Sequence, residues 1–384
     1  MASATPPNLL VSFLPWISLD DEICLGKVTL WPFRSASKDK IREPAVQEHL
    51  EKYFECYVDH QGRPVRKITI CSYGDVDFRA LPKAELQDLR HVVDALLFIS
   101  VIPEATLAVS ENNPYNAPPS AENFELVHLE FLPGKELLTV VVGNCQHMGY
   151  TTDMISFQKP WAASEGKVQP SDFWAKAFHH LFDASILETD RGLIFRSLEW
   201  FRLAHFNSDD ISPLSKVLMM ATAFEVLLAV PPDINQKKRW IAEELERWIE
   251  TSKFIRGTRT DNKGKTFLAS KLGWWAWDFY ELRNAIVHGD QIQPRQLEYR
   301  VPGLDWLTHL MVADLVFGEC IARKLFRLGC FEKGQSFRAL SPGHPEEAFI
   351  RFFRPLFGDF FEALSWMSSQ ECTNSIPSGM NKQP

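Results

Sequence analysis

The spacing of hydrophobic residues changes character near the middle of the chain. From about Asp172 onward, apolar residues recur every three or four positions in six successive segments, the spacing of helices that bury one face. Such a run of amphipathic segments predicts a helical bundle. The predicted helices are Asp172–Leu187, Gly192–Phe206, Ser212–Val230, Asn235–Phe254, Leu272–Gly289 and Leu304–Gly329.

The first part of the chain has a different pattern, with segments rich in β-branched residues that are typical of strands. Predicted strands are Cys24–Phe33, Arg66–Gly74 and Glu136–Asn144. The segment Phe124–Gly143 predicts a hairpin, because its first arm alternates apolar and polar residues and a Pro-Gly-Lys sequence supplies the turn. A helix is predicted over Pro82–Ser100, where apolar residues recur at helical spacing and Pro82 suits the first turn.

The two patterns meet at Gln158–Asp172, where proline, glycine and small residues cluster as they do in linkers. We therefore predict an α+β protein, with a mixed, strand-rich domain over residues 1–158 and an all-helical, up-and-down bundle over residues 172–332. A helical extension over 333–367 and a polar, disordered tail over 368–384 would follow. The architecture suggests a sensor or regulatory role for the N-terminal domain.

Charge limits the ways in which this chain can bind nucleic acid. The formal net charge of the 384 residues is −8, so contact with a polyanion requires a local basic surface. Basic residues gather at Gln236–Trp240 and Lys253–Lys265, which makes these segments candidates for RNA binding or, alternatively, a solvated helix start and a solvated loop. The candidate RNA-binding residues are Lys237, Lys238, Arg239, Arg256, Arg259, Lys263 and Lys265.

Several classes of protein lack support in the sequence. The seven cysteines form no C-x-x-C pair, so neither a zinc ribbon nor a disulfide framework is indicated, and we expect no metal or other cofactor. Signatures of serine hydrolases, zinc proteases and dinucleotide-binding folds are missing, and Asn262–Thr266 lacks the glycine spacing of a phosphate loop. The first residues lack the basic start of a signal peptide, and no uncharged apolar stretch approaches about 18 residues. We expect a cytoplasmic protein with no membrane partner.

The end of the fifth predicted helix, Glu281–Asp290, carries the candidate chemistry. Gly289 can adopt the left-handed conformation that ends a helix, and His288 is well placed against the negative end of the helix dipole. Helix termination does not explain Arg283 or Asn284. Asn284 and His288 are four residues apart and share a face, whereas Arg283 lies about 140° from His288 around an ideal helix. A long arginine side chain can still reach towards the imidazole.

These three residue types suit cleavage of an RNA phosphodiester without a metal ion. His288 can take the proton from a 2′-hydroxyl or deliver one to the leaving oxygen. Arg283 can hold the phosphate and its developing charge, and Asn284 can orient either partner. One histidine cannot easily act as acid and base at once, so a symmetric dimer would help by supplying a second copy.

The sequence RNAIVH at Arg283–His288 resembles the R-x4–6-H motif of HEPN domains, all-helical modules many of which are metal-independent ribonucleases. The segment AFEVLLAV at Ala223–Val230, with a long helix after the motif, is similar to the Apea-like HEPN subgroup. The resemblance covers roughly Phe173–Leu328, under half of the chain.

The resemblance implies a HEPN-like bundle that forms a homodimer, with Arg283 and His288 of both copies in one composite site. It implies an RNA endonuclease of anti-phage defence or a toxin, triggered by a phage-derived or host protein. Glu225 would support the site through a hydrogen bond to Arg283 or His288. Some relatives are inactive, so the alternative is a non-catalytic dimeric scaffold that senses a phage or host factor. The chain departs from the R-x4-H-x-Y form, because Asp290 stands where the tyrosine would be.

Overall fold

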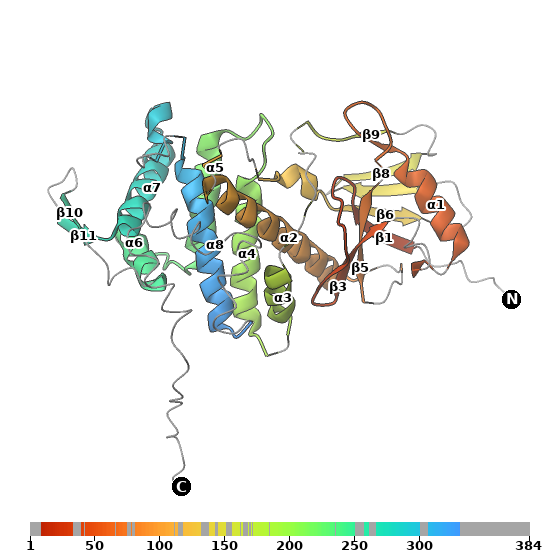
Figure 1. Ribbon diagram of the computed structural model, residues 1–384, viewed down its shortest axis with the longest axis horizontal. Coiled ribbons are helices and arrows are strands. Elements are labelled where there is room, and N and C mark those ends of the chain that lie inside the picture. Colours follow the sequence, from red (N-terminus) through yellow and green to blue (C-terminus); the bar gives the residue numbers. More distant parts are fainter. Residues whose placement is uncertain are drawn as a thin grey trace, which may run out of the picture.

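In the computed structural model, strands gather at one end of the molecule and helices at the other, and the long helix α2 (Lys83–Ser110) connects the two (Figure 1). The predicted α+β class is confirmed, whereas the specific HEPN-like, up-and-down arrangement stays a prediction. The structure describes residues 9–33, 40–41, 43–65, 67–74, 78, 81–110, 112–113, 118–131, 138–142, 145–150, 156–161, 163, 168, 170, 172–183, 185–234, 236–249, 257–260, 266–299 and 306–330. The predicted extension at 333–367 and tail at 368–384 lie outside these residues.

Within the described part of the chain, the main sheet is antiparallel and follows the order β2-β3-β5-β1-β6-β7-β8. Its strands are β1 (Leu9–Leu14), β2 (Ile23–Leu25), β3 (Val28–Phe33), β5 (Ile68–Tyr73), β6 (Val127–Phe131), β7 (Leu138–Val142) and β8 (Cys145–Tyr150). A separate parallel pair joins β4 (Tyr57–Val58) to β9 (Phe157–Gln158). The predicted strand Arg66–Gly74 contains β5, and the predicted hairpin is the antiparallel pair of β6 and β7.

The prediction of one strand over Cys24–Phe33 is wrong, because the chain reverses inside it. Gly26 has φ +62°, and Leu25 pairs with Val28 across a two-residue turn between β2 and β3. Glycine favours this backbone conformation, and an added Cβ would also lie 2.5 Å from the Phe182 ring. The β-branched composition identified extended structure but not the turn.

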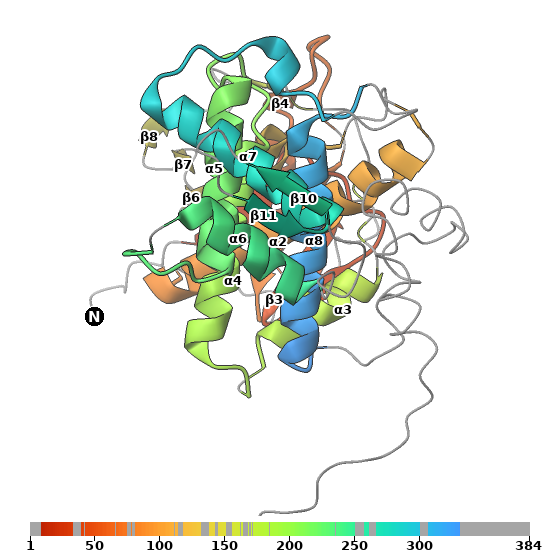
Figure 2. The ribbon, with the colours of Figure 1, turned by 90° about the vertical axis from the view of Figure 1, so that its left-hand side faces the viewer.

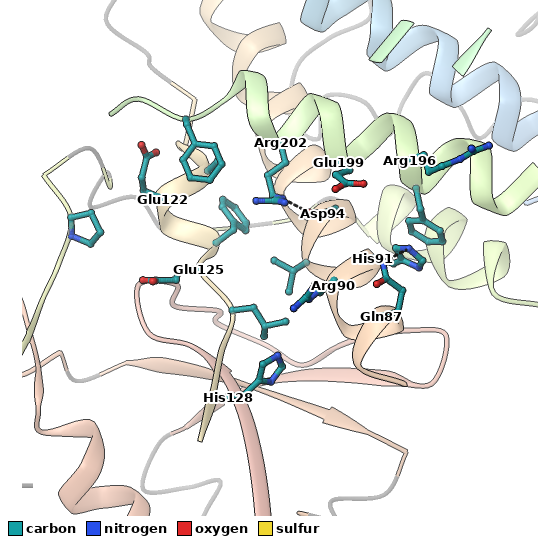
Figure 3. A pocket seen from close by; sticks show the side chains of 17 residues that line it. Gln87, Arg90, His91, Asp94, Glu122, Glu125, His128, Arg196, Glu199 and Arg202 are labelled. Carbon is teal, nitrogen blue, oxygen red and sulfur yellow. Dashed lines mark hydrogen bonds and ion pairs between the residues drawn. The ribbon is translucent and has the colours of Figure 1, made fainter. Parts of the chain in front are cut away.

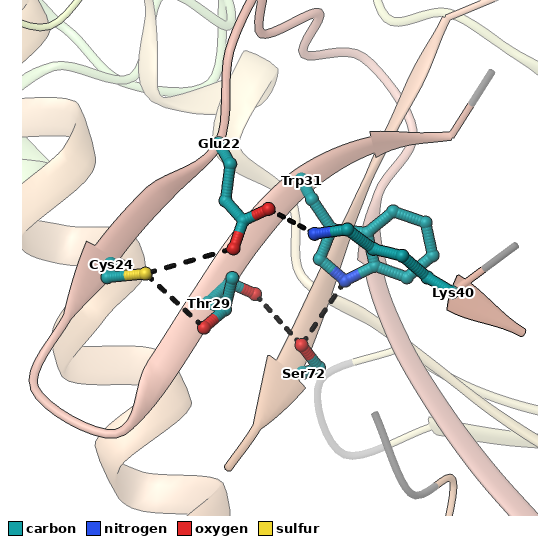
Figure 4. A network of polar contacts seen from close by, with 6 residues as sticks. All are labelled: Glu22, Cys24, Thr29, Trp31, Lys40 and Ser72. Carbon is teal, nitrogen blue, oxygen red and sulfur yellow. Dashed lines mark hydrogen bonds and ion pairs between the residues drawn. The ribbon is translucent and has the colours of Figure 1, made fainter. Parts of the chain in front are cut away.

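A polar network stabilises this hairpin (Figure 4). The Cys24 thiol contacts Glu22 Oε1 at 4.0 Å and Thr29 Oγ1 at 3.6 Å. Trp31 Nε1 donates to Ser72 Oγ at 3.2 Å, and Ser72 in turn donates to the Thr29 carbonyl at 3.3 Å. The second of these chains ties β3 to β5.

Strands β1, β3 and β5 of the sheet are buried on both faces, because their alternate side chains enter two different hydrophobic clusters. On one face, Phe13 of β1 packs edge-on against Tyr53 of α1 (Pro44–Phe54), with ring centroids 6.0 Å apart. On the other face, Leu14 belongs to the cluster that contains Leu89 of α2. Neither α1 nor β1 was predicted from the sequence.

Each of the six predicted C-terminal helices overlaps a helix of the structure. These are α3 (Asp172–Leu181), α4 (Glu188–Ala204), α5 (Pro213–Leu227), α6 (Lys237–Trp248), α7 (Lys271–His288) and α8 (His309–Arg327). Of these, α4 begins four residues before its predicted start at Gly192. The helix predicted at Pro82–Ser100 is α2, which continues through Pro103 and ends at Ser110, ten residues beyond the predicted end. One hydrophobic cluster runs from α2 through α8, so the buried core is continuous across the expected linker.

Among the described residues, the segment Lys83–Val109 of α2 is long and apolar enough to cross a membrane by composition alone. In the structure, 83% of its most apolar window is buried among other elements. A central core helix of a globular fold has the same composition.

The chain between α6 and α7 contains a hairpin of β10 (Gly257–Thr260) and β11 (Thr266–Ala269). The alternative prediction of a solvated loop over Lys253–Lys265 is wrong at Gly257–Thr260, which forms strand β10. Figure 2 shows the hairpin in front of α6 and α7. Phe267 of β11 stacks on Trp277 of α7, with ring centroids 4.9 Å apart, and so holds the hairpin against the helix. Two short 3-10 helices complete the described elements, η2 (Ala121–Phe124) and η5 (Pro294–Gln296).

Candidate functional site

The candidate residues lie at the carboxyl end of α7. The local sequence determines where this helix begins and where it ends. At the start, Ser270 Oγ accepts a hydrogen bond from the Gly273 amide at 3.3 Å. At the end, Gly289 has φ +79°, and its amide donates to the Ile286 carbonyl at 3.1 Å. The Asp290 amide donates to the Ala285 carbonyl at 2.9 Å, which completes a Schellman motif. The helix therefore ends at His288, as the sequence predicts.

The middle of α7 anchors the site to the rest of the fold. Trp275 and Phe279 are fully buried and stacked, with centroids 5.3 Å apart, so these aromatic residues belong to the core. The Tyr280 hydroxyl donates to the Ala221 carbonyl of α5 at 2.8 Å. Burial raises the pKa of Tyr280 well above its ordinary value, so the hydroxyl stays a donor at neutral pH. This bond fixes α7 beside α5.

One turn beyond Tyr280, Arg283 faces Glu225 of α5. Arg283 Nη2 lies 3.5 Å from Glu225 Oε1, and Arg283 Nη1 donates to Asn284 Oδ1 at 3.2 Å. Lys237 Nζ, at the start of α6, donates to Glu225 Oε2 at 3.0 Å. Glu225 thus lies between two cations, and the Arg283 side chain is only 24% exposed. The structure brings together Glu225, Arg283 and Asn284.

His288 is arranged differently from Arg283. Its side chain is exposed, next to Val287, which is 54% exposed. Within the described part of the chain, His288 makes no hydrogen bond or ion pair, including with Arg283 or Asn284. The imidazole is therefore accessible to a ligand from solvent, whereas Arg283 is held in place by protein groups.

Three of the candidate RNA-binding residues lie in the first turn of α6 and form ion pairs. Lys237 forms the ion pair with Glu225 described above. Lys238 Nζ lies 3.6 Å from Glu281 and 4.2 Å from the centre of the Trp277 ring. Arg239 Nε donates to Glu243 at 2.8 Å. These ion pairs offset part of the positive charge near the end of α7. Of the three basic residues, Arg239 is exposed, whereas Lys237 and Lys238 are partly buried.

The other candidate RNA-binding residues belong to the hairpin region. Arg259 lies on β10 and pairs with Phe267 across the hairpin, and its side chain is not among those described. Arg256, Lys263 and Lys265 lie outside the described residues. Across the part of the chain that the structure describes, no group of three His, Cys, Asp or Glu side chains is placed to hold a metal ion.

A second polar region, which the sequence did not predict, is a cavity of about 660 Å³ between α2, α4, η2 and β6 (Figure 3). Charged groups from α2 and α4 meet there, including Asp94 and Arg202, whose Oδ1 and Nε atoms are 2.7 Å apart. Burial raises the pKa of Asp94 to about 6, although Arg202 partly opposes the shift. Because the lining comes from four separate elements, no local motif could have revealed it.

No family model, curated protein or solved structure matches this chain.

Proposed function

We propose that the protein is a metal-independent RNA endonuclease of HEPN type, active in the cytoplasm in anti-phage defence or as a toxin. The observation that carries the proposal is that an exposed histidine and a fixed arginine occur within two turns of one helix end. His288 is accessible at the last residue of α7, and Arg283 is held between Glu225 and Asn284 less than two turns earlier. An accessible acid or base beside a preorganised cation is what phosphodiester cleavage requires.

Each side chain has a role that its contacts support. Arg283 uses two of its terminal nitrogens for Glu225 and Asn284, and its remaining N–H groups can bind phosphate oxygens. Two cations, Arg283 and Lys237, surround the single carboxylate of Glu225, which leaves a net positive charge for a phosphate. Asn284 receives the Arg283 hydrogen bond and so orients the guanidinium.

The proposed reaction needs both an acid and a base. In a homodimer that brings two α7 ends together, one His288 can accept the 2′-hydroxyl proton while the other protonates the leaving 5′-oxygen. The exposed Val287 beside each histidine provides apolar surface for such a contact. A phage-derived or host protein would act as the trigger.

The proposal is tested with the purified full-length protein, total cellular RNA and EDTA, with and without lysate from phage-infected cells. His288→Ala and Arg283→Ala should each lower the cleavage rate by about 100-fold or more, the usual contribution of a general acid or base or of an oxyanion-type donor. His180→Ala is a matched control, because His180 is also exposed near a helix end and forms its ion pair with the nearby Asp183. Equal cleavage by wild type and His288→Ala, or none by wild type in either condition, would contradict the proposal.

The second candidate is a non-catalytic dimeric HEPN scaffold that senses a phage or host factor. It is favoured by the contacts of Arg283, which lies mostly buried against Glu225 and could serve structure alone. The negative Asp290 directly after the helix end also disfavours phosphate binding. In that case, Arg283→Ala lowers stability but leaves biological activity intact whenever the variant folds.

A further inference from the structure

The cavity at the junction of sheet and helices has the properties of a ligand site that is separate from the α7 end. Its volume of about 660 Å³ lies within the range of small-molecule sites. Its walls come from four elements, with α2 and α4 on one side and η2 and β6 on the other (Figure 3). Apolar lining is provided by Val93, Phe124, Leu126 and Phe206.

Three of the four carboxylates that line the cavity have fixed partners. Asp94 pairs with Arg202 at 2.7 Å, and Glu125 accepts a hydrogen bond from Trp16 Nε1 at 2.9 Å. Glu122 accepts from the Asn207 amide at 2.8 Å. Of these three carboxylates, only Asp94 is paired with a cation, whereas Glu125 and Glu122 accept from neutral N–H groups and keep their negative charge.

Three further charged groups line the cavity, and one of them, Arg196, uses its Nε to donate to the Gly192 carbonyl at 3.3 Å. Arg90 of α2 and Glu199 of α4 are both exposed, and neither forms a hydrogen bond or ion pair with any residue that the structure describes. They lie around the same buried carboxylate, because Arg90 and Glu199 both act electrostatically on Asp94. Figure 3 shows them on either side of that residue.

A buried ring adds an independent sign of a ligand. His128 of β6 is only 8% exposed and lines the cavity on the side of Arg90 (Figure 3). Its Nδ1 lies 2.8 Å from Ser12 Oγ, while Nε2 has no hydrogen-bond partner among the described residues. Burial and the charge of Arg90 lower the pKa of His128 to about 4, so the ring is neutral at pH 7. A ring nitrogen on the lining of a cavity, with no partner among the described residues, can form a hydrogen bond with a ligand.

We propose that this cavity binds a zwitterionic small molecule with an apolar side chain, namely an amino acid or a short peptide. Its carboxylate lies against Arg90 and His128, its ammonium group against Glu199, and its side chain against the phenylalanines of the wall. A simple anion would meet the uncompensated charge of Glu199, and a simple cation would meet that of Arg90. Only a molecule that carries both charges matches both residues. This site does not depend on the RNA endonuclease proposal.

The test is isothermal titration of the full chain with phenylalanine, leucine and leucylphenylalanine. At least one of them should bind, with a dissociation constant in the range of about 10 μM to 1 mM. N-acetylphenylalanine lacks the ammonium group and phenylalaninamide lacks the carboxylate. If phenylalanine binds, each blocked form should bind about tenfold or more weakly, the effect of losing one charged hydrogen bond. The corresponding blocked forms serve for leucine or the dipeptide.

Two variants assign the charges to residues. Arg90→Ala should bind the free and the carboxyl-blocked ligand equally, and Glu199→Gln should bind the free and the amino-blocked ligand equally. Both residues are exposed, so these variants should fold, and Arg63→Ala, an exposed arginine outside the cavity lining, is the control that should behave as wild type. The proposal is overturned if none of the three probes binds at about 10 mM, a limit weaker than any useful affinity. Equal binding of free and blocked ligands by the wild-type protein would overturn it as well.

Discussion

The cavity and the end of α7 both combine arginine, histidine and carboxylate side chains, but the fold holds them in different ways. In the cavity, Asp94 is 7% exposed and lies 2.7 Å from Arg202 on a different helix. At the end of α7, Arg283 lies 3.5 Å from Glu225, and His288 of the same helix is exposed and has no partner among the described residues. One region is built by tertiary packing, and the other mostly by a single helix and its cap.

This difference determines what each region can contribute to stability and to function. Charges that are removed from water interact strongly and are costly to leave unpaired, whereas exposed charges are screened and contribute little. Of the two regions, the cavity with its buried pair should therefore make the larger electrostatic contribution to folding. The exposed residues at the end of α7, Val287 and His288, can be substituted at small cost, which is typical of a surface that meets a ligand.

The largest effect is expected from Asp94→Asn as the pH changes. The pKa of Asp94 is about 6 in the folded protein against 3.8 as its ordinary value, so the folded state binds the proton more tightly. By linkage, the wild-type protein then loses stability as pH rises from about 4 to about 6, by about 3 kcal/mol relative to a variant that cannot ionise there. Urea unfolding of both proteins at several pH values measures the difference.

Asp59→Asn is the matched control for this experiment. Backbone and side-chain hydrogen bonds from Arg63 hold the pKa of the partly exposed Asp59 at about 2, so its ionisation stabilises the fold and this contribution changes only below pH 4. Between pH 4 and 6, the stability difference between wild type and Asp59→Asn should stay flat. If the difference for Asp94→Asn is equally flat, the Asp94 carboxyl is not desolvated as the structure implies.

The same comparison explains how much of the fold was predictable from sequence. The six C-terminal helices and α2 repeat apolar residues at helical spacing, and that period can be read directly from the chain. Strand β1 was missed because Leu9–Leu14 is buried on both faces and does not alternate. The turn at Gly26 and the hairpin of β10 and β11 were missed because their signals are short and lie within polar or β-branched segments.

Prediction of the candidate site follows the same rule. Arg283, Asn284, His288 and Gly289 are neighbours in sequence, so helical spacing alone places them at one helix end. The position of Glu225 beside Arg283 followed only from a resemblance, since 58 residues separate the two positions. In the cavity, Arg90 and Glu199 are more than a hundred residues apart, and only the packing of α2 against α4 brings them near one another. Local motifs reveal sites on one element and cannot reveal sites between elements.

A smaller effect is expected when Glu225 loses its charge. Glu225→Gln leaves Arg283 and Lys237 without the carboxylate that contacts both, so the free energy of unfolding should fall by about 2 kcal/mol, the effect of losing charged hydrogen bonds in a half-buried position. Glu243→Gln is the control, because its pair with Arg239 is exposed on both sides and should contribute about 0.5 kcal/mol or less. Equal effects in urea unfolding would show that the α7 end is no better ordered than an ordinary surface.

The smallest effect concerns the glycine that ends α7. Gly289 has φ +79° and an added Cβ would touch nothing within 4 Å, so Gly289→Ala tests backbone conformation without steric interference. The variant should lose about 1 kcal/mol, the cost of a left-handed conformation for a residue with a side chain. Gly192 of α4 is equally free of contacts but has no positive φ, so Gly192→Ala should instead gain about 0.5–1 kcal/mol from its higher helix propensity.

Hydrogen exchange shows where the Gly289→Ala effect acts. The amides of residues 289 and 290 donate to Ile286 and Ala285, and their exchange should speed up about fivefold for a local loss of about 1 kcal/mol, while the Trp275 amide in the buried part of α7 keeps its rate. A loss spread evenly along α7 would mean that its end and its core unfold as one unit. In that case the end of α7 would not open more easily than its core. The backbone at His288 would then be as stable against local opening as the buried part of the helix.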